Sequence, residues 1–67
     1  MASLLTLEGV RAAGLADGRA RRPRAPMLQH VRWVWMNHAR PSASAIEVVD
    51  ALEVYERAWA TGYKAGR

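Results

Sequence analysis

The sequence has no cysteine and no phenylalanine, and it is only 67 residues long. Without cysteine, neither a disulfide framework nor a thiolate zinc site can stabilise the fold. Three tryptophans, two tyrosines and a few aliphatic residues must therefore form most of the core. A chain of this length buries only about 60% of its unfolded surface. We expect one small domain that associates with a partner, most simply as a homodimer.

The sequence also lacks any apolar run near the roughly 20 residues of a membrane-spanning helix. It does not open with a basic region followed by an apolar stretch, which argues against a signal peptide. These absences predict a cytoplasmic protein with no membrane contact.

No motif typical of an enzyme is present. Four carboxylates follow one another at intervals of three residues along one predicted helix: Glu47, Asp50, Glu53 and Glu56. This spacing distributes them around the helix and does not form an acid–base pair in a pocket. There is no glycine-rich phosphate loop and no nucleophile elbow. His30 and His38 lack the further ligands that a metal site needs. We expect no catalytic residue, no metal and no cofactor.

The apolar periodicity predicts an all-α protein, a small bundle of two or three helices with a long C-terminal helix. We expect helices over 3–19, 27–39 and 42–64, separated by a basic proline-containing linker over 20–26. Thr6 or Ser3 is expected to cap the first helix, and Ser42 or Ser44 the last. A strand around 31–35 is the alternative for the middle segment, because Val31, Trp33 and Trp35 alternate.

The spacing of the apolar residues also predicts which helical faces are buried. On the first helix the predicted face comprises Leu4, Leu7, Arg11, Gly14, Leu15 and Gly18. On the last it comprises Ala45, Val48, Val49, Leu52, Tyr55, Trp59 and Tyr63. In the middle segment we expect Trp35 to pack inward and Trp33 to be available for contacts.

Positive charge is concentrated in the first part of the chain. Residues 1–40 carry seven arginines against two acids (+5), whereas residues 41–67 carry three bases against four acids (−1), which together give the net charge of +4. This asymmetry indicates an anionic partner for the first part.

Four arginines lie within six residues, and we call them the arginine cluster: Arg19, Arg21, Arg22 and Arg24. Arginine binds phosphate in a bidentate manner, so the cluster predicts nucleic-acid binding, with Arg32 and Trp33 supplementing it. The alternative is a solvated linker that merely aids solubility. We expect Arg21 and Arg22 to lie away from every apolar face.

Residues 13–19 are echoed by residues 61–67, and each copy carries two glycines four residues apart followed by an arginine. This repeat predicts a pseudo-symmetric helical hairpin in which Gly14 and Gly62 allow two helices to approach closely. The competing interpretation is that Gly62 or Gly66 ends the last helix.

The pattern Trp59-x-x-Gly62-Tyr63, together with the phrase that ends in Gly18-Arg19 and the basic linker, resembles the ribosome modulation factor family. Members of that family are short, basic, helical proteins that bind bacterial ribosomes and favour inactive dimeric particles. The resemblance implies that Arg19, Trp59, Gly62 and Tyr63 are RNA-contact or core residues.

From the sequence we expect a small accessory protein that binds structured RNA or the ribosome through the arginine cluster. The alternative is a protein-binding module, such as a phage-like or plasmid-like inhibitor or an assembly subunit, that docks on an acidic protein surface. The residues expected at a protein interface are Trp33, Met36, Trp59 and Tyr63.

Overall fold

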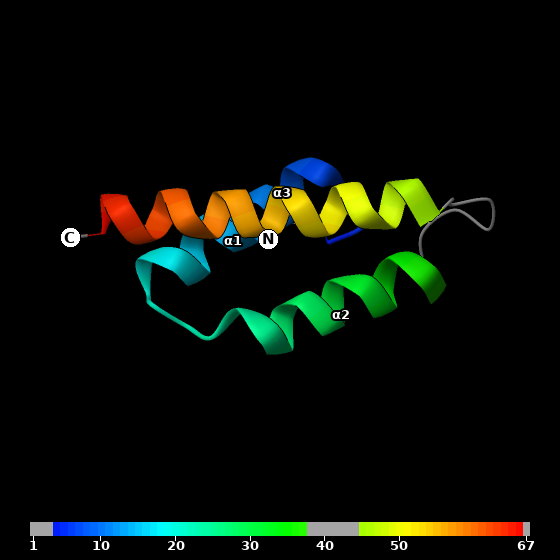
Figure 1. The fold of residues 1–67 in the computed structure, drawn as a ribbon, viewed down its shortest axis with the longest axis horizontal. Coiled ribbons are helices and arrows are strands. Elements are labelled where there is room, and N and C mark those ends of the chain that lie inside the picture. The colour runs from blue at the N-terminus through cyan, green and yellow to red at the C-terminus, as the bar shows by residue number, and fades with distance from the viewer. Residues whose placement is uncertain (1–3, 38–44, 67) are drawn as a thin grey trace.

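The computed structural model describes residues 4–37 and 45–66, without the side chains of residues 45 and 46. Three helices account for nearly all of these residues: α1 (Leu7–Arg19), α2 (Arg24–Asn37) and α3 (Ala45–Ala65). No residue in the described ranges is in a strand, so the predicted all-α bundle with a long C-terminal helix is confirmed (Figure 1). The predictions for Ser3, His38, Ser42 and Ser44 lie outside the described residues.

Helices α1 and α3 run in the same direction, and α2 runs back against them (Figure 1). The predicted hairpin is therefore wrong, because α2 returns the chain to the end of the molecule where α1 began. The two copies of the glycine repeat nevertheless lie side by side. Leu15 of the first copy contacts Gly62 of the second, and Arg19 contacts Gly66.

The start of α1 and the start of α2 follow from local chemistry. Thr6 caps α1, and its hydroxyl oxygen accepts a 3.0 Å hydrogen bond from the backbone N–H of Gly9. Helix α2 begins at Arg24, so residues 24–26 of the predicted linker are helical. Pro26 is tolerated there because the first turn of a helix has no partner for its N–H groups.

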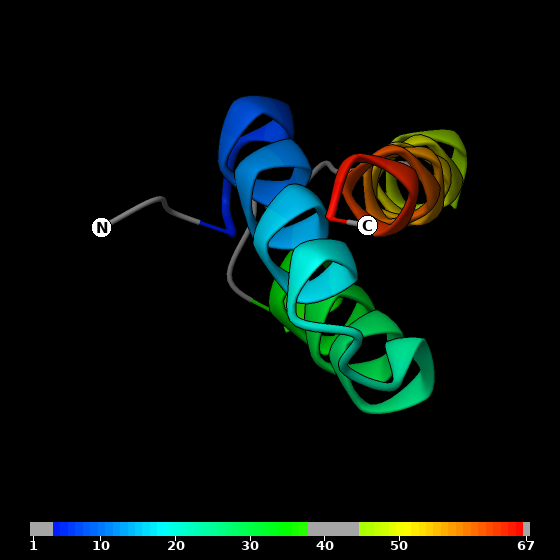
Figure 2. The ribbon, with the colours of Figure 1, turned by 90° about the vertical axis from the view of Figure 1, so that its left-hand side faces the viewer.

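The core gathers side chains from all three helices: Val10, Val31, Trp35, Ala51 and Tyr55. Trp35 is buried as predicted, and its indole N–H donates a 2.6 Å hydrogen bond to the carbonyl oxygen of Leu4. Leu7, in contrast, is 45% exposed. Its predicted burial is wrong because α1 and α3 diverge toward the start of α1 (Figure 2).

The crossing of α1 and α3 depends on glycines at its closest point. A Cβ atom placed on Gly14 would lie 2.7 Å from the carbonyl oxygen of Tyr55. One placed on Gly18 would lie 2.9 Å from the backbone nitrogen of Tyr63 and would collide with the carbonyl oxygen of Trp59. One placed on Gly62 would collide with the carbonyl oxygen of Leu15. Close packing through glycine is therefore the role of the repeat.

The competing interpretation of Gly62 as the end of a helix is wrong. Gly62 lies inside α3, which continues to Ala65. No glycine in the described parts of the chain has a positive φ, the conformation that a glycine cap would need.

Candidate nucleic-acid interface

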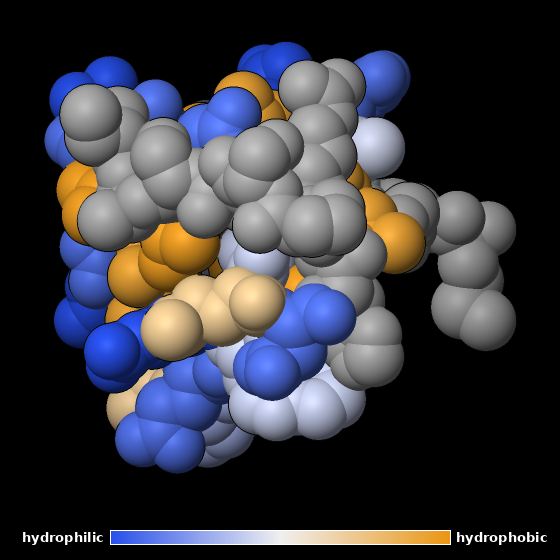
Figure 3. Space-filling view, turned by 90° about the vertical axis from the view of Figure 1, so that its right-hand side faces the viewer, coloured by the Kyte–Doolittle hydropathy of each residue, from blue (hydrophilic) through white to orange (hydrophobic). Residues whose placement is uncertain are grey.

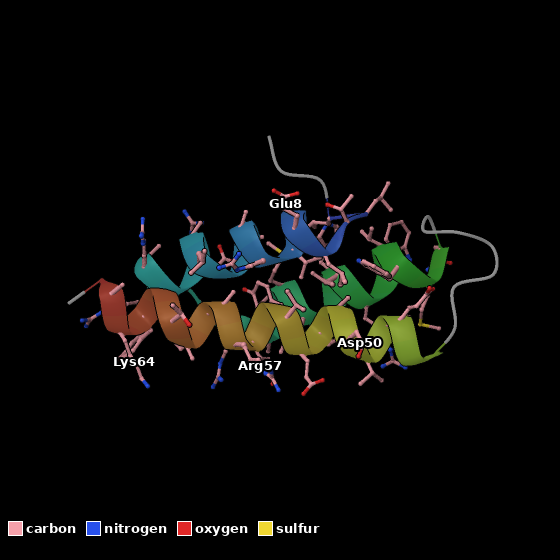
Figure 4. All side chains as sticks on the ribbon, turned by 90° about the horizontal axis from the view of Figure 1, so that it is seen from above. Glu8, Asp50, Arg57 and Lys64 are labelled. Atoms are coloured by element: carbon pink, nitrogen blue, oxygen red, sulfur yellow. The ribbon has the colours of Figure 1, made fainter. Side chains whose placement is uncertain are left out.

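The arginine cluster lies at the end of the molecule where α1 ends, α2 begins and α3 ends. Figure 2 looks onto this end and shows the last turn of α1, the connection to α2 and the last turn of α3 close together. Lys64 of α3 lies at the same end, whereas Asp50 lies toward the other end of that helix (Figure 4). The fold thus adds a lysine about 40 residues further along the chain to the four arginines.

The connection between α1 and α2 has a defined backbone. The N–H of Arg21 donates to the carbonyl oxygen of Gly18 at 3.1 Å, and the N–H of Arg22 donates to that of Asp17 at 2.9 Å. These two bonds form the Schellman arrangement that closes a helix, in which the residue after the C-cap is usually glycine. Here that residue is Arg21, which has a φ of 57°.

Two arginines of the cluster pack on aromatic rings of α3. The guanidinium carbon of Arg24 lies 4.7 Å from the ring centroid of Trp59, and that of Arg21 lies 5.2 Å from the ring centroid of Tyr63. The two rings stack on each other with centroids 5.2 Å apart and planes 13° apart. The contacts therefore link Arg24, Trp59, Tyr63 and Arg21 in that order, and we call these four residues the arginine–aromatic stack.

The stack is tied to the connection by a further hydrogen bond. The indole N–H of Trp59 donates to the carbonyl oxygen of Arg22 at 2.9 Å. Trp59 is therefore held by the stacking contacts of its ring and by the hydrogen bond of its indole N–H. The indole nitrogen, which would otherwise be available to a ligand, is already used within the protein.

Arg22 is held differently, by a carboxylate that is almost completely buried. Asp17 is 5% exposed, and its two oxygens accept from Arg22 Nη1 at 3.1 Å and from the Tyr55 hydroxyl at 2.6 Å. Burial and the hydrogen bond to Asp17 raise the pKa of Tyr55 well above its ordinary value. This network joins the connection to both α1 and α3.

We predicted that Arg21 and Arg22 lie away from every apolar face, and this prediction is wrong. Arg21 lies over the ring of Tyr63, and Arg22 pairs with the buried carboxylate of Asp17. Sequence reasoning correctly predicted the burial of Tyr55, but it missed the burial of Asp17 and the hydrogen bond between the two. The available signal was the position of Asp17, three residues after Gly14 and thus on the same face of α1.

The structure does not bring every predicted contact residue to this end. Arg32 and Trp33 lie eight and nine residues after Arg24 on α2, so they are about 12–14 Å further along the helix axis. Trp33 is 54% exposed and Met36 is 62% exposed, and both point away from the buried side of α2. Trp59 and Tyr63 were predicted both on the buried face of the last helix and at a protein interface, and they are partly buried members of the stack.

The described residues contain no group of three or more histidine, aspartate or glutamate side chains that could hold a metal ion. In the same ranges, no helix has the length and apolarity required to cross a bilayer.

Comparison with known proteins gives no match to a family model, to a curated protein or to a solved structure.

Proposed function

We propose that this protein binds nucleic acid, and RNA in particular, through the arginine cluster and Lys64. The observation that supports this is the position of five cationic side chains at one end of the molecule, where three of the arginines are held by contacts within the protein and Lys64 lies on the side of α3 away from α1 (Figure 4). Each of the five is exposed. Such a surface neutralises several phosphates at once and releases their condensed counterions.

RNA is favoured over a specific DNA sequence by the side chains available for reading bases. An exposed helix carrying asparagine, glutamine and arginine toward a major groove would be the usual device for reading DNA. Around the cluster, the exposed groups are instead guanidinium and ammonium groups, which bind phosphates and do not distinguish one base from another. Ribosomal RNA is the target that the glycine–aromatic–arginine phrases suggest, and the cytoplasm is the corresponding location.

A pull-down of the protein from a cell extract, with and without nuclease, gives the first test. We expect RNA to be retained by the untreated sample and lost from the treated one. Fluorescence anisotropy with a structured RNA at two salt concentrations then measures the affinity. Removal of one phosphate contact is expected to reduce the slope of log K against log salt by about 0.7–0.9.

The double variant Arg19→Gln/Lys64→Gln tests the location of the site, because neither side chain belongs to the arginine–aromatic stack. The matched control is Arg11→Gln/Arg32→Gln, which removes the same charge from positions outside the cluster. We expect the first variant to lose affinity and salt dependence clearly more than the control. Equal losses would show that net charge, and not this surface, determines binding.

A second candidate function, docking on another protein, is favoured by the exposed apolar residues of α2 and α3. Trp33 and Met36 of α2 and Val49 of α3 are each more than half exposed. A groove lies between the helices and is lined by Leu28, Leu52 and Val49, with Arg32 on one side and Glu53 on the other. Figure 3 shows hydrophobic residues at the surface near the end where α2 ends and α3 begins.

The same pull-down distinguishes this candidate. A single protein that stays bound after nuclease treatment, and that is lost with Trp33→Ser/Met36→Ser, would support docking. Self-association through this face would appear in analytical ultracentrifugation as a dimer that the same double substitution dissociates.

A further inference from the structure

We infer that the arginine cluster recognises the phosphate backbone of a double-helical RNA segment and not its unpaired bases. This inference rests on the proposed RNA-binding function and names the form of RNA that the site accepts. It is carried by how the arginines and aromatic rings of the site are already engaged.

The aromatic rings near the cluster are not free to stack on bases. Proteins that bind single strands use open aromatic faces as platforms for successive bases. Here Trp59 is stacked with Tyr63 and has Arg24 over its ring, while Tyr63 is stacked with Trp59 and has Arg21 over its ring. Each of these rings therefore already has one aromatic neighbour and one guanidinium neighbour within 5.2 Å of its centroid.

The arginines, in contrast, keep hydrogen-bond donors available at their edges. A guanidinium group that lies over an aromatic ring is held in orientation by its face, and its N–H groups point outward in the guanidinium plane. Arg22 gives one nitrogen to Asp17, yet its side chain remains 66% exposed. The site therefore offers phosphate-binding edges from Arg21, Arg22 and Arg24.

These edges are held in place before any ligand arrives. Each of the three arginines has a contact that restricts its rotamers, and the Schellman closure fixes the backbone between α1 and α2. Ordering a free arginine upon binding costs side-chain entropy, and much of that cost is absent here. A prepositioned set of donors favours a ligand whose phosphates are also prepositioned.

A double helix meets that requirement and a single strand does not. Proteins recognise double-stranded RNA mainly by its shape and by its phosphate and ribose groups, since its major groove is too narrow for side chains. A flexible single strand must instead lose conformational freedom to match three fixed guanidinium groups. The geometry therefore selects the duplex.

The test compares a duplex RNA of about 20 base pairs with each of its two strands, chosen to have no internal pairing, by anisotropy at one salt concentration. We expect the duplex to bind about tenfold more tightly per site than either strand. If a strand binds as tightly as the duplex, the inference is overturned while RNA binding stands. If no RNA binds at all, the proposed function fails and the inference fails with it.

Arg24→Lys tests the role of the fixed guanidinium, with Arg32→Lys on α2 as its matched control. Both substitutions keep the charge, but only the first removes a planar group stacked on Trp59. We expect Arg24→Lys to weaken duplex binding about tenfold, with a change below about twofold for Arg32→Lys and unchanged thermal melts for both. Equal effects of the two substitutions, or no effect of either, would overturn the inference, because charge alone would then explain the affinity.

Discussion

The hydroxyl of Tyr55 on α3 donates a 2.6 Å hydrogen bond to the carboxylate of Asp17 on α1. Tyr55 is fully buried and Asp17 is nearly so. A buried carboxylate is costly unless its oxygens are hydrogen-bonded, and here Tyr55 serves one oxygen and Arg22 the other. The pair thus links the two parallel helices to the connection that carries the arginine cluster.

We predict that Tyr55→Phe lowers the free energy of unfolding by about 1–3 kcal/mol, because one oxygen of the buried carboxylate loses its donor. Urea denaturation monitored by circular dichroism measures this. The matched control is Tyr63→Phe, which deletes a hydroxyl from a partly exposed ring while keeping the stack, and it should change stability by less than about 0.5 kcal/mol. Equal effects would mean that the hydrogen bond to Asp17 contributes nothing specific.

Stability should also decrease at alkaline pH because of Tyr55. Its pKa is raised in the folded state by burial and by the bond to Asp17, whereas in the unfolded chain it ionises near the ordinary value of about 10. The contribution is fully present below pH 10 and is lost as the pH rises above it. We expect the wild type to lose about 1.4 kcal/mol per pH unit more than Tyr55→Phe above pH 10. If the free energy of unfolding has the same pH dependence in both proteins, Tyr55 is not the group responsible for the loss of stability.

Gly62→Ala should destabilise the protein by about 1–3 kcal/mol, because its β-carbon would meet the backbone of Leu15. Helix propensity alone predicts the opposite sign, a gain of about 1 kcal/mol. Ala60→Gly at an exposed position of α3 measures that propensity term separately. A stabilised Gly62→Ala protein would show that α1 and α3 do not approach closely. A glycine at a helix crossing often tolerates alanine, but at Gly62 the contact is too close even for a methyl group.

The backbone at Arg21 yields a prediction about two substitutions that both remove its contact with Tyr63. Arg21→Gly should be more stable than Arg21→Ala by about 1 kcal/mol, because a residue with a β-carbon is strained at a φ of 57°. The same pair at Arg32, inside α2, should give the reverse order by a similar amount. Thermal melts of the four variants decide this, and the same order at both positions would exclude a left-handed conformation at Arg21.

The helices and their order could be predicted from periodicity, capping residues and prolines, because these signals act within a few residues of the chain. Thr6 as the cap of α1 and Trp35 as a core residue are examples. The exposure of Leu7 could not be predicted, since it depends on where two helices diverge. The parallel arrangement of α1 and α3 was equally hidden, because the path of the connecting helix is set by packing.

Part of the candidate site was visible in the sequence and part was not. The arginine cluster was evident from charge density, and Trp59 and Tyr63 from their spacing. The contact between the arginines and the rings was not evident, because Arg24 and Trp59 are 35 residues apart and the sequence does not show which residues meet across the fold. The role of Asp17 was also missed, since its position on the same face of α1 as Gly14 indicates burial but does not reveal the partners Tyr55 and Arg22.

The parallel arrangement has a consequence for how the chain folds. Gly14 contacts Ala58, which is 44 residues further along the sequence, and most of the contacts between helices in the described structure join α1 to α3. Small helical proteins usually fold quickly because their contacts are between neighbours in the chain. Here the main helix pair closes a long loop, whose entropy must be lost before the contact is gained. The pair that holds the molecule together is therefore the one whose formation costs the chain the most loop-closure entropy.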